Sequence, residues 1–347
     1  MPVSSNLQLS IILPIYNVAP YVEKCIRSLE DQDLPKDSYE IICVNDGSPD
    51  NSQKIVEKLQ QEFPNIKLIN QENQGVSMAR NNGMAMASGD YLMMIDPDDY
   101  IVPASLKEKI NFVVKNKLDV GVCAYTILNV KNEPIFYFNP PFNLKTPLTG
   151  IDYFNSYLKG KVEIMDPDRS VAIFYRREFL KDHNLFYLSD VPYLEDGEFL
   201  YRVYSLAKKV MFLNNQFYMR TTRMGSATNS KLIFHDRAKK GFLKAARNLK
   251  SFQSDFDNSS KEFKFLNQPL AKFFFLYLTG SNRYWFLPDY FRIARSIKNE
   301  FPKIGHQESS AFYSKFAKHY NRSLFNFYFQ YCIYNVFNSI KNKIRGN

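Results

Sequence analysis

The sequence predicts an α/β fold with a mostly parallel sheet in residues 1–230 and a helical region in residues 231–347. Short apolar runs rich in β-branched residues alternate with segments whose apolar residues recur at helical spacing. Turn residues close each run, and this alternation is typical of a doubly wound sheet with flanking helices. The last third instead shows aromatic helix faces opposite Lys and Arg, which predicts a separate helical region.

Each element follows from its local pattern. Apolar runs predict strands over residues 9–13, 39–44, 66–70, 91–95, 119–127, 171–175 and 210–218. Helical spacing between them predicts helices over residues 18–30, 51–63, 76–87, 104–115, 151–158, 177–183 and 195–207. Clear helical patterns in the tail cover residues 242–252, 270–278, 290–297 and 324–340. We place the boundary between the two regions near residues 229–235.

Composition excludes several classes of protein. An apolar fraction of 45% and an aromatic fraction of 16% supply a packed core, which excludes wholesale disorder. The four cysteines are scattered without CxxC spacing, so they read as reduced thiols and not as a disulfide framework or a zinc site. With neither a signal segment nor an apolar run of about 20 residues, we expect a cytoplasmic protein.

The net charge of +10 is concentrated in the tail. Residues 231–347 hold 21 Lys and Arg against 7 Asp and Glu, whereas residues 1–230 hold 24 against 28. A basic, aromatic tail on a slightly acidic body predicts an anionic partner for the tail, either a membrane surface or a polyanion.

Three carboxylates follow the strand over residues 91–95, at Asp96, Asp98 and Asp99. Carboxylates this close repel one another, and Mg²⁺ or Mn²⁺ would relieve the repulsion. The alternative is an Asp-Pro-Asp turn that caps the next helix. Tyr16, Asn17 and Asp46 also follow strands. Ligands of open parallel sheets bind outside the carboxyl ends of the strands. The turns that follow the strands over residues 9–13, 39–44 and 91–95 therefore predict one shared site.

These segments together resemble glycosyltransferase family 2, the inverting nucleotide-sugar transferases with the GT-A fold. The matching segments are Ile12-Leu13-Pro14-Ile15-Tyr16-Asn17, Val44-Asn45-Asp46-Gly47-Ser48, Asn73-Gln74-Gly75-Val76-Ser77-Met78-Ala79-Arg80-Asn81 and Ser88 through Asp99. The resemblance continues more faintly to about residue 228. It implies a nucleotide-binding half in residues 1–127, an acceptor half in residues 128–230 and a UDP-sugar donor.

The resemblance implies donor-side roles for five residues. Pro14, Tyr16 and Asn17 would lie beside the nucleotide base, with Tyr16 stacking on uracil. Asp46 would accept a hydrogen bond from the base or the ribose, and Arg80 would lie near the nucleotide. Without the resemblance, the local sequence also fits ordinary turn residues or, for Arg80, a solvated surface position.

The acid cluster corresponds to the family's D-x-D motif. This implies that Asp96 contacts the ribose and the ion, Asp98 ligates Mn²⁺ or Mg²⁺ directly, and Asp99 supports them. The family's Glu-Asp pair falls on Glu195 and Asp196, with Asp196 as the general base and Glu195 as its neighbour or substitute. The local alternative is that the helix macrodipole stabilises acidic residues in a first helical turn whatever their function.

Related transferases close a loop over the pyrophosphate where this chain has Arg220, Arg223 and Ser226. Guanidinium groups suit that ligand, although a basic surface loop fits the same residues. Residues 166–170 depart from the aromatic-x-Lys segment that relatives often carry before a pattern like Tyr175-Arg176-Arg177-Glu178-Phe179. The acceptor therefore does not follow from the resemblance.

The function implied is transfer of a hexose or N-acetylhexosamine from a UDP-sugar to a glycan or lipid-linked glycan, in bacterial surface polysaccharide synthesis. The tail would lie on the cytoplasmic face of the inner membrane, or pack on the body or on a second subunit. A nucleotidyltransferase would need a Gly-rich basic loop after the first strand, where this chain has Pro14-Ile15-Tyr16-Asn17. A nucleic-acid binder leaves the acid cluster unexplained, so nucleic acid is not an expected partner.

Overall fold

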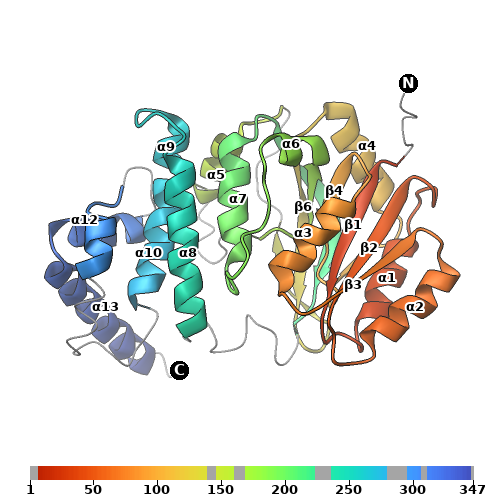
Figure 1. Ribbon diagram of the computed structural model, residues 1–347, viewed down its shortest axis with the longest axis horizontal. Coiled ribbons are helices and arrows are strands. Elements are labelled where there is room, and N and C mark those ends of the chain that lie inside the picture. The colour runs from red at the N-terminus through yellow and green to blue at the C-terminus, as the bar shows by residue number, and fades with distance from the viewer. Residues whose placement is uncertain are drawn as a thin grey trace. The chain divides into compact units, whose positions relative to one another are not determined.

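The computed structural model describes residues 7–138, 146–159, 169–222, 236–279, 295–305 and 311–344. The chain divides into two units, residues 1–230 and residues 231–347. The first unit holds the sheet, and the described residues of the second hold only helices and their connections (Figure 1).

The first unit alternates strands and helices through most of its length. Its elements are β1 (Leu9–Ile15), α1 (Val22–Glu30), β2 (Tyr39–Asp46), α2 (Ser52–Glu62), β3 (Ile66–Gln71), α3 (Val76–Met86), β4 (Tyr91–Met94), β5 (Tyr100–Ile101), α4 (Leu106–Asn116), β6 (Val120–Leu128), β7 (Pro134–Phe138), α5 (Gly150–Lys159), β8 (Ile173–Arg176), α6 (Arg177–Asp182), α7 (Glu195–Leu206) and β9 (Val210–Arg220).

The strands form one nine-stranded sheet in the order β3-β2-β1-β4-β8-β6-β9-β5, with β7 paired to β6. The strands β1, β2, β3, β4, β6 and β9 share one direction, while β5, β7 and β8 run against them. The predicted α/β fold with a mostly parallel sheet is confirmed. Because β1 to β4 are parallel, their carboxyl ends meet at one edge, and the polar turns gather there.

Helices cover both faces of the sheet. Alternate residues of β1, among them Ile11 and Leu13, are fully buried in one core with Ile26 of α1 and residues of α2 and α4. Ile12 points to the opposite face, where α3 lies across β1 (Figure 1). A Cβ atom on Gly83 would overlap the Ile12 side chain. Glycine at this position therefore allows α3 to approach the sheet closely, which brings Arg80 to the sheet edge.

Three features of the sheet were not predicted. The strands β5, which is only two residues long, and β7, which is apolar but mostly exposed, were not expected. The segment over residues 171–175 was predicted as a strand, but its insertion as β8, antiparallel between β4 and β6, was not. Periodicity reports which residues face a core and carries no information on strand direction.

The second unit contains α8 (Asp236–Gln253), α9 (Lys261–Phe265), α10 (Asn267–Thr279), α12 (Ala311–Arg322) and α13 (Leu324–Ile344). The predicted helical, aromatic character is confirmed, and α9 and α12 are additions to it. Part of the helix predicted over residues 290–297 lies outside the described residues. Aromatic rings join the last helices, since the partly buried Phe275 of α10 contacts the buried Phe316 of α12 and Phe327 of α13.

Candidate active site

Asp46 ends β2 and holds the turn that starts α3. Its carboxylate is buried and accepts hydrogen bonds from Gln71 Nε2 at 2.8 Å and from the backbone N–H groups of Gln74 and Gly75 at 2.7 and 2.9 Å. Gly75 has a φ of +88°, which suits glycine at the start of the helix. Asp46 thus has a structural role, and its oxygens retain the capacity to accept further hydrogen bonds.

The turn after β1 lies against the turn after β2. Pro14 is buried within β1, whereas Tyr16 and Asn17 are exposed, Tyr16 by 47%. Asn17 has a φ of +52°, and its N–H donates to Ser48 Oγ at 2.8 Å. The two turns are therefore joined by hydrogen bonds, and the Tyr16 ring is accessible to a ligand.

The acid cluster follows β4 directly. Oxygen atoms of Asp96, Asp98 and Asp99 lie within 4.8 Å of one another. Asp99 is 3% exposed and accepts hydrogen bonds from the Tyr218 hydroxyl at 2.6 Å and from the Thr221 N–H at 2.7 Å. Burial, reinforced by Asp96 and Asp98, raises the pKa of Asp99 well above its usual range. Three carboxylates that offer hard oxygen donors and repel one another fit a divalent cation.

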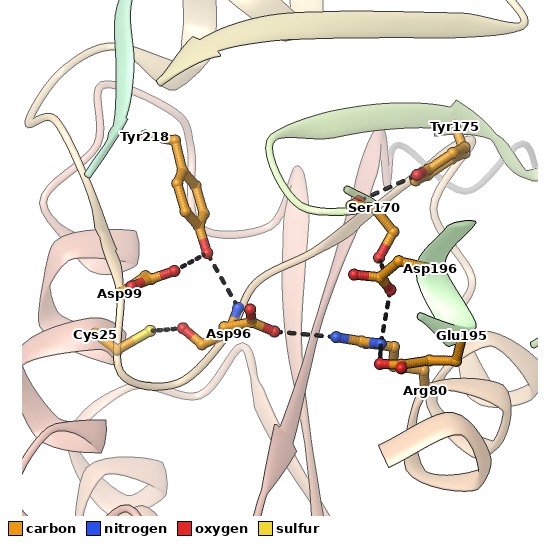
Figure 2. A network of polar contacts seen from close by, with 9 residues as sticks. All are labelled: Cys25, Arg80, Asp96, Asp99, Ser170, Tyr175, Glu195, Asp196 and Tyr218. Carbon is orange, nitrogen blue, oxygen red and sulfur yellow. Dashed lines mark hydrogen bonds and ion pairs between the residues drawn. The ribbon is translucent and has the colours of Figure 1, made fainter. Parts of the chain in front are cut away.

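Arg80 of α3 connects this cluster to a second group of acids. Its side chain is 3% exposed. Nη2 donates to Asp96 Oδ1 at 3.1 Å, and Nη1 donates to Glu195 Oε1 and Asp196 Oδ1 at 3.0 and 2.9 Å (Figure 2). The guanidinium also lies 5.1 Å from the centre of the Tyr187 ring. One cation thus faces three carboxylates, so the network carries excess negative charge.

The ring beneath Arg80 is held by the next residue of α3. Asn81 Nδ2 donates to the Tyr187 carbonyl, and the Tyr187 N–H donates to Asn81 Oδ1, both at 2.8 Å. Two neighbouring residues of α3 therefore act together. Arg80 makes the ion pairs, and Asn81 holds the Tyr187 ring on which the Arg80 guanidinium stacks.

Glu195 and Asp196 begin α7. Leu194 precedes them with a φ of +59°, a backbone conformation that L residues rarely adopt. Burial and the neighbouring Asp196 raise the pKa of Glu195 to about 7. Burial also raises the pKa of Asp196, against the opposing effect of Arg80. A carboxylate whose pKa lies near neutrality suits general base catalysis.

The end of β9 meets the acid cluster. Arg220 closes β9, and Thr221 Oγ1 donates to the Asp98 carbonyl at 2.6 Å, so the chain leaves the sheet beside the cluster. Arg223 and Ser226 lie outside the described residues.

The structure adds three residues that the sequence did not single out. Ser170 Oγ donates to Asp196 Oδ1 at 2.6 Å, Tyr187 stacks on Arg80, and the Tyr218 hydroxyl joins Asp99 to the backbone N–H of Asp96. For Tyr218, its place near the carboxyl end of the last strand was a usable signal. Ser170 and Tyr187 lie in irregular segments, which carry no comparable pattern.

Comparison with known proteins settles the family. The model of glycosyl transferase family 2 matches residues 10–184, about half of the chain. The chain belongs to glycosyl transferase family 2. The matched residues include β1 to β4, the acid cluster and Arg80, so the resemblance predicted from the sequence is confirmed.

Bacterial proteins are among the curated relatives of this family member. The glycosyltransferase EpsJ of Bacillus subtilis, described as uncharacterized, is 33% identical over 219 residues, which cover 63% of this chain and 62% of EpsJ. A poly(ribitol-phosphate) beta-glucosyltransferase of Bacillus spizizenii is 28% identical over 59% of this chain and 30% of its own length. The chain thus spans less than two thirds of each of these relatives.

Among solved structures, S. aureus TarS 1–349 in complex with UDP-GlcNAc superposes with a TM-score of 0.60. The match covers 81% of this chain and 75% of that one, at 23% identity. At this identity the likeness shows a shared fold, the GT-A fold of TarS.

Proposed function

We propose that this chain is an inverting glycosyltransferase that moves a hexose or N-acetylhexosamine from a UDP-sugar to a glycan or lipid-linked glycan acceptor. The observation that carries the proposal is the Arg80 network, which places an acid cluster suited to a cation next to a partly buried Glu-Asp pair suited to base catalysis. Family membership and the binding of UDP-GlcNAc by TarS support a UDP-sugar donor. Relatives that glucosylate poly(ribitol-phosphate) support a role in bacterial surface polysaccharide synthesis.

Asp98 and Asp96 would hold Mg²⁺ or Mn²⁺, with Asp99 fixed behind them by Tyr218 and Thr221. When bound, the ion supplies Lewis-acid stabilisation of the diphosphate leaving group. Asp96 would also contact the ribose. The Asp96 carboxylate is 37% exposed, so it is accessible to a ligand while it keeps its ion pair with Arg80.

Asp196 would act as the general base. It takes the proton from the acceptor hydroxyl as that oxygen forms a bond to the anomeric carbon. The bond between the anomeric carbon and the diphosphate oxygen breaks at the same time, and its electron pair leaves with UDP. Attack in line with the leaving group inverts the configuration. Glu195 would share Arg80 with Asp196 and keep the pair's pKa high.

The remaining predicted residues would bind the nucleotide. Tyr16 is exposed at the end of β1 and offers its ring to the base, beside Pro14 and Asn17. Asp46 would accept from the base or ribose with the lone pairs that its structural bonds leave open. Arg220, with Arg223 and Ser226 farther along the chain, would close over the diphosphate.

The proposal is tested by UDP release from a panel of UDP-sugars with Mn²⁺ or Mg²⁺. We expect activity with at least one donor, its loss on adding EDTA, and a decrease of at least about 100-fold in Asp98→Ala, because the ion stabilises the transition state by several kcal/mol. Asp90→Ala is the matched control, since Asp90 is an exposed acid just before β4. Full activity of Asp98→Ala in EDTA would refute the metal site.

We further propose that the second unit contacts the cytoplasmic face of the inner membrane. Phe325 and Phe329 of α13 are 75% and 54% exposed and stack on each other. Lys315, Lys318 and Arg322 lie along one side of α12 around a surface pocket, and among the described residues none has an ion-pair partner. No helix in the described part of the chain is both long and apolar enough to cross a membrane. Exposed aromatic rings on α13 and a row of cations on α12 of the same unit fit an interfacial contact.

Sedimentation with phosphatidylglycerol vesicles tests this contact. We expect binding to weaken about 10-fold or more in Lys315→Glu/Lys318→Glu and in Phe325→Ser/Phe329→Ser, because each basic residue near an anionic surface contributes about 1 kcal/mol. Lys54→Glu and Phe112→Ser, exposed positions of the first unit, serve as controls. Absence of vesicle binding, or a concentration-dependent dimer that the same substitutions disrupt, would favour a subunit contact instead.

A further inference from the structure

Asp196 Oδ1 already accepts two hydrogen bonds within the protein. Arg80 Nη1 donates to it at 2.9 Å and Ser170 Oγ donates to it at 2.6 Å. Figure 2 draws no bond from the labelled residues to the other carboxylate oxygen. We propose that Ser170 is a positioning residue for the base: it holds the Asp196 carboxylate in one orientation and assigns the acceptor proton to Oδ2. This inference rests on the proposed function of Asp196.

Ser170 can hold the base because its own place is determined by the sheet. The residue is fully buried, and its carbonyl accepts a hydrogen bond from the Tyr175 hydroxyl of β8 at 3.1 Å. Val171 forms a bridge with Met94 at the end of β4, and Ala172 follows with a φ of +59°. A backbone kept in this disfavoured conformation is determined by its surroundings, so the hydroxyl is presented at a defined point.

The two donors act on the carboxylate in different ways. Arg80 forms ion pairs with Asp96, Glu195 and Asp196, so all three acids together determine the position of its guanidinium group. Ser170 Oγ has one acid partner among the described residues. Together they stabilise negative charge on Oδ1 and stop rotation of the carboxylate about its terminal torsion, which is broad in a free side chain. Oδ2 is then the oxygen that can meet an acceptor hydroxyl in the geometry that proton transfer requires.

A positioning role and a merely structural role predict different kinetics. If Ser170 only supports the fold, its loss lowers the stability and the amount of active protein. The loss of any other buried serine would then have the same effect. If it orients the base, its loss lowers kcat for transfer and leaves the affinity for the donor unchanged, because the nucleotide residues are untouched.

The experiment compares Ser170→Ala, Ser170→Thr and Ser205→Ala in the full chain. Ser205 is also buried, on α7, but its hydroxyl donates to the Arg202 carbonyl away from the site. Each variant is assayed for kcat with saturating donor, for KM of the UDP-sugar and for thermal unfolding. We expect kcat of Ser170→Ala to fall about 10-fold or more with KM nearly unchanged, as expected for a lost hydrogen bond to a charged group. Ser170→Thr, which keeps the hydroxyl, should recover most of kcat, and Ser205→Ala should keep it.

Three outcomes would overturn the inference. One is wild-type kcat in Ser170→Ala, and another is an equal loss of kcat in Ser205→Ala. The third is a rise in KM that accounts for the whole loss of kcat/KM. Asp196→Asn, measured alongside, separates this inference from the function on which it rests. An inactive Asp196→Asn with a normal Ser170→Ala removes only the role of Ser170, whereas an active Asp196→Asn removes both.

Discussion

Asp196→Asn should lower kcat for sugar transfer by about 10²–10⁴-fold, the usual contribution of a positioned general base. The amide keeps the shape of the side chain and can still accept from Ser170 and Arg80, but it cannot take the acceptor proton. The affinity for UDP should change little, because Asp196 lies with the Glu-Asp pair at the start of α7 and not with the turns proposed to bind the nucleotide.

Glu195→Gln is the comparison that assigns the base to one acid of the pair. It should cost much less activity than Asp196→Asn, since among the described residues Glu195 contacts Arg80 without a second side-chain donor of the kind that Ser170 provides. The pH dependence of kcat/KM supplies a second measurement. The base must be ionised, and burial raises the pKa of both acids, that of Glu195 to about 7. Activity should therefore rise with pH toward neutrality, as the coupled pair loses its proton. A larger loss in Glu195→Gln, or full activity at pH 4, would contradict the assignment.

Arg80→Met should lower the free energy of unfolding by about 3–5 kcal/mol at pH 8, the cost of removing one partner from a buried ionic network. Methionine keeps an apolar side chain against Tyr187, but Asp96, Glu195 and Asp196 then face one another without a cation. The loss should be smaller at pH 5. Without Arg80 the pKa values of Glu195 and Asp196 rise further, so the native state binds more protons than the unfolded chain does, and stability falls as pH rises.

Urea unfolding at pH 5 and pH 8 measures this effect, with Arg80→Lys as the matched variant. Lysine keeps the charge but not the planar fork that reaches three acids, so we expect an intermediate loss. If Arg80→Met loses the same free energy at both pH values, the contribution of Arg80 lies in packing and not in charge.

The fold followed from local patterns because burial leaves a direct trace in the sequence. The runs that became β1, β2 and β4 are mostly apolar and buried throughout, as strands covered on both faces require. The acid cluster was also recognisable, since three aspartates within four positions of the chain are close in sequence as well as in the fold. Strand direction left no such trace, which is why the antiparallel insertion of β8 between β4 and β6 emerged only from the tertiary structure.

The sequence by itself determined the α/β fold class, the turns at the sheet edge, and which residues of the family motifs are present. The tertiary structure alone decided what those residues touch. Residue 80 is separated from residues 195 and 196 by more than a hundred positions, and nothing in the local sequence distinguishes a buried arginine with three carboxylate partners from a solvated one. Ser170 is likewise an ordinary serine until the chain places it 2.6 Å from Asp196. Hydrogen bonds and ion pairs depend on distances of a few ångströms between segments remote in sequence, and only packing sets those distances.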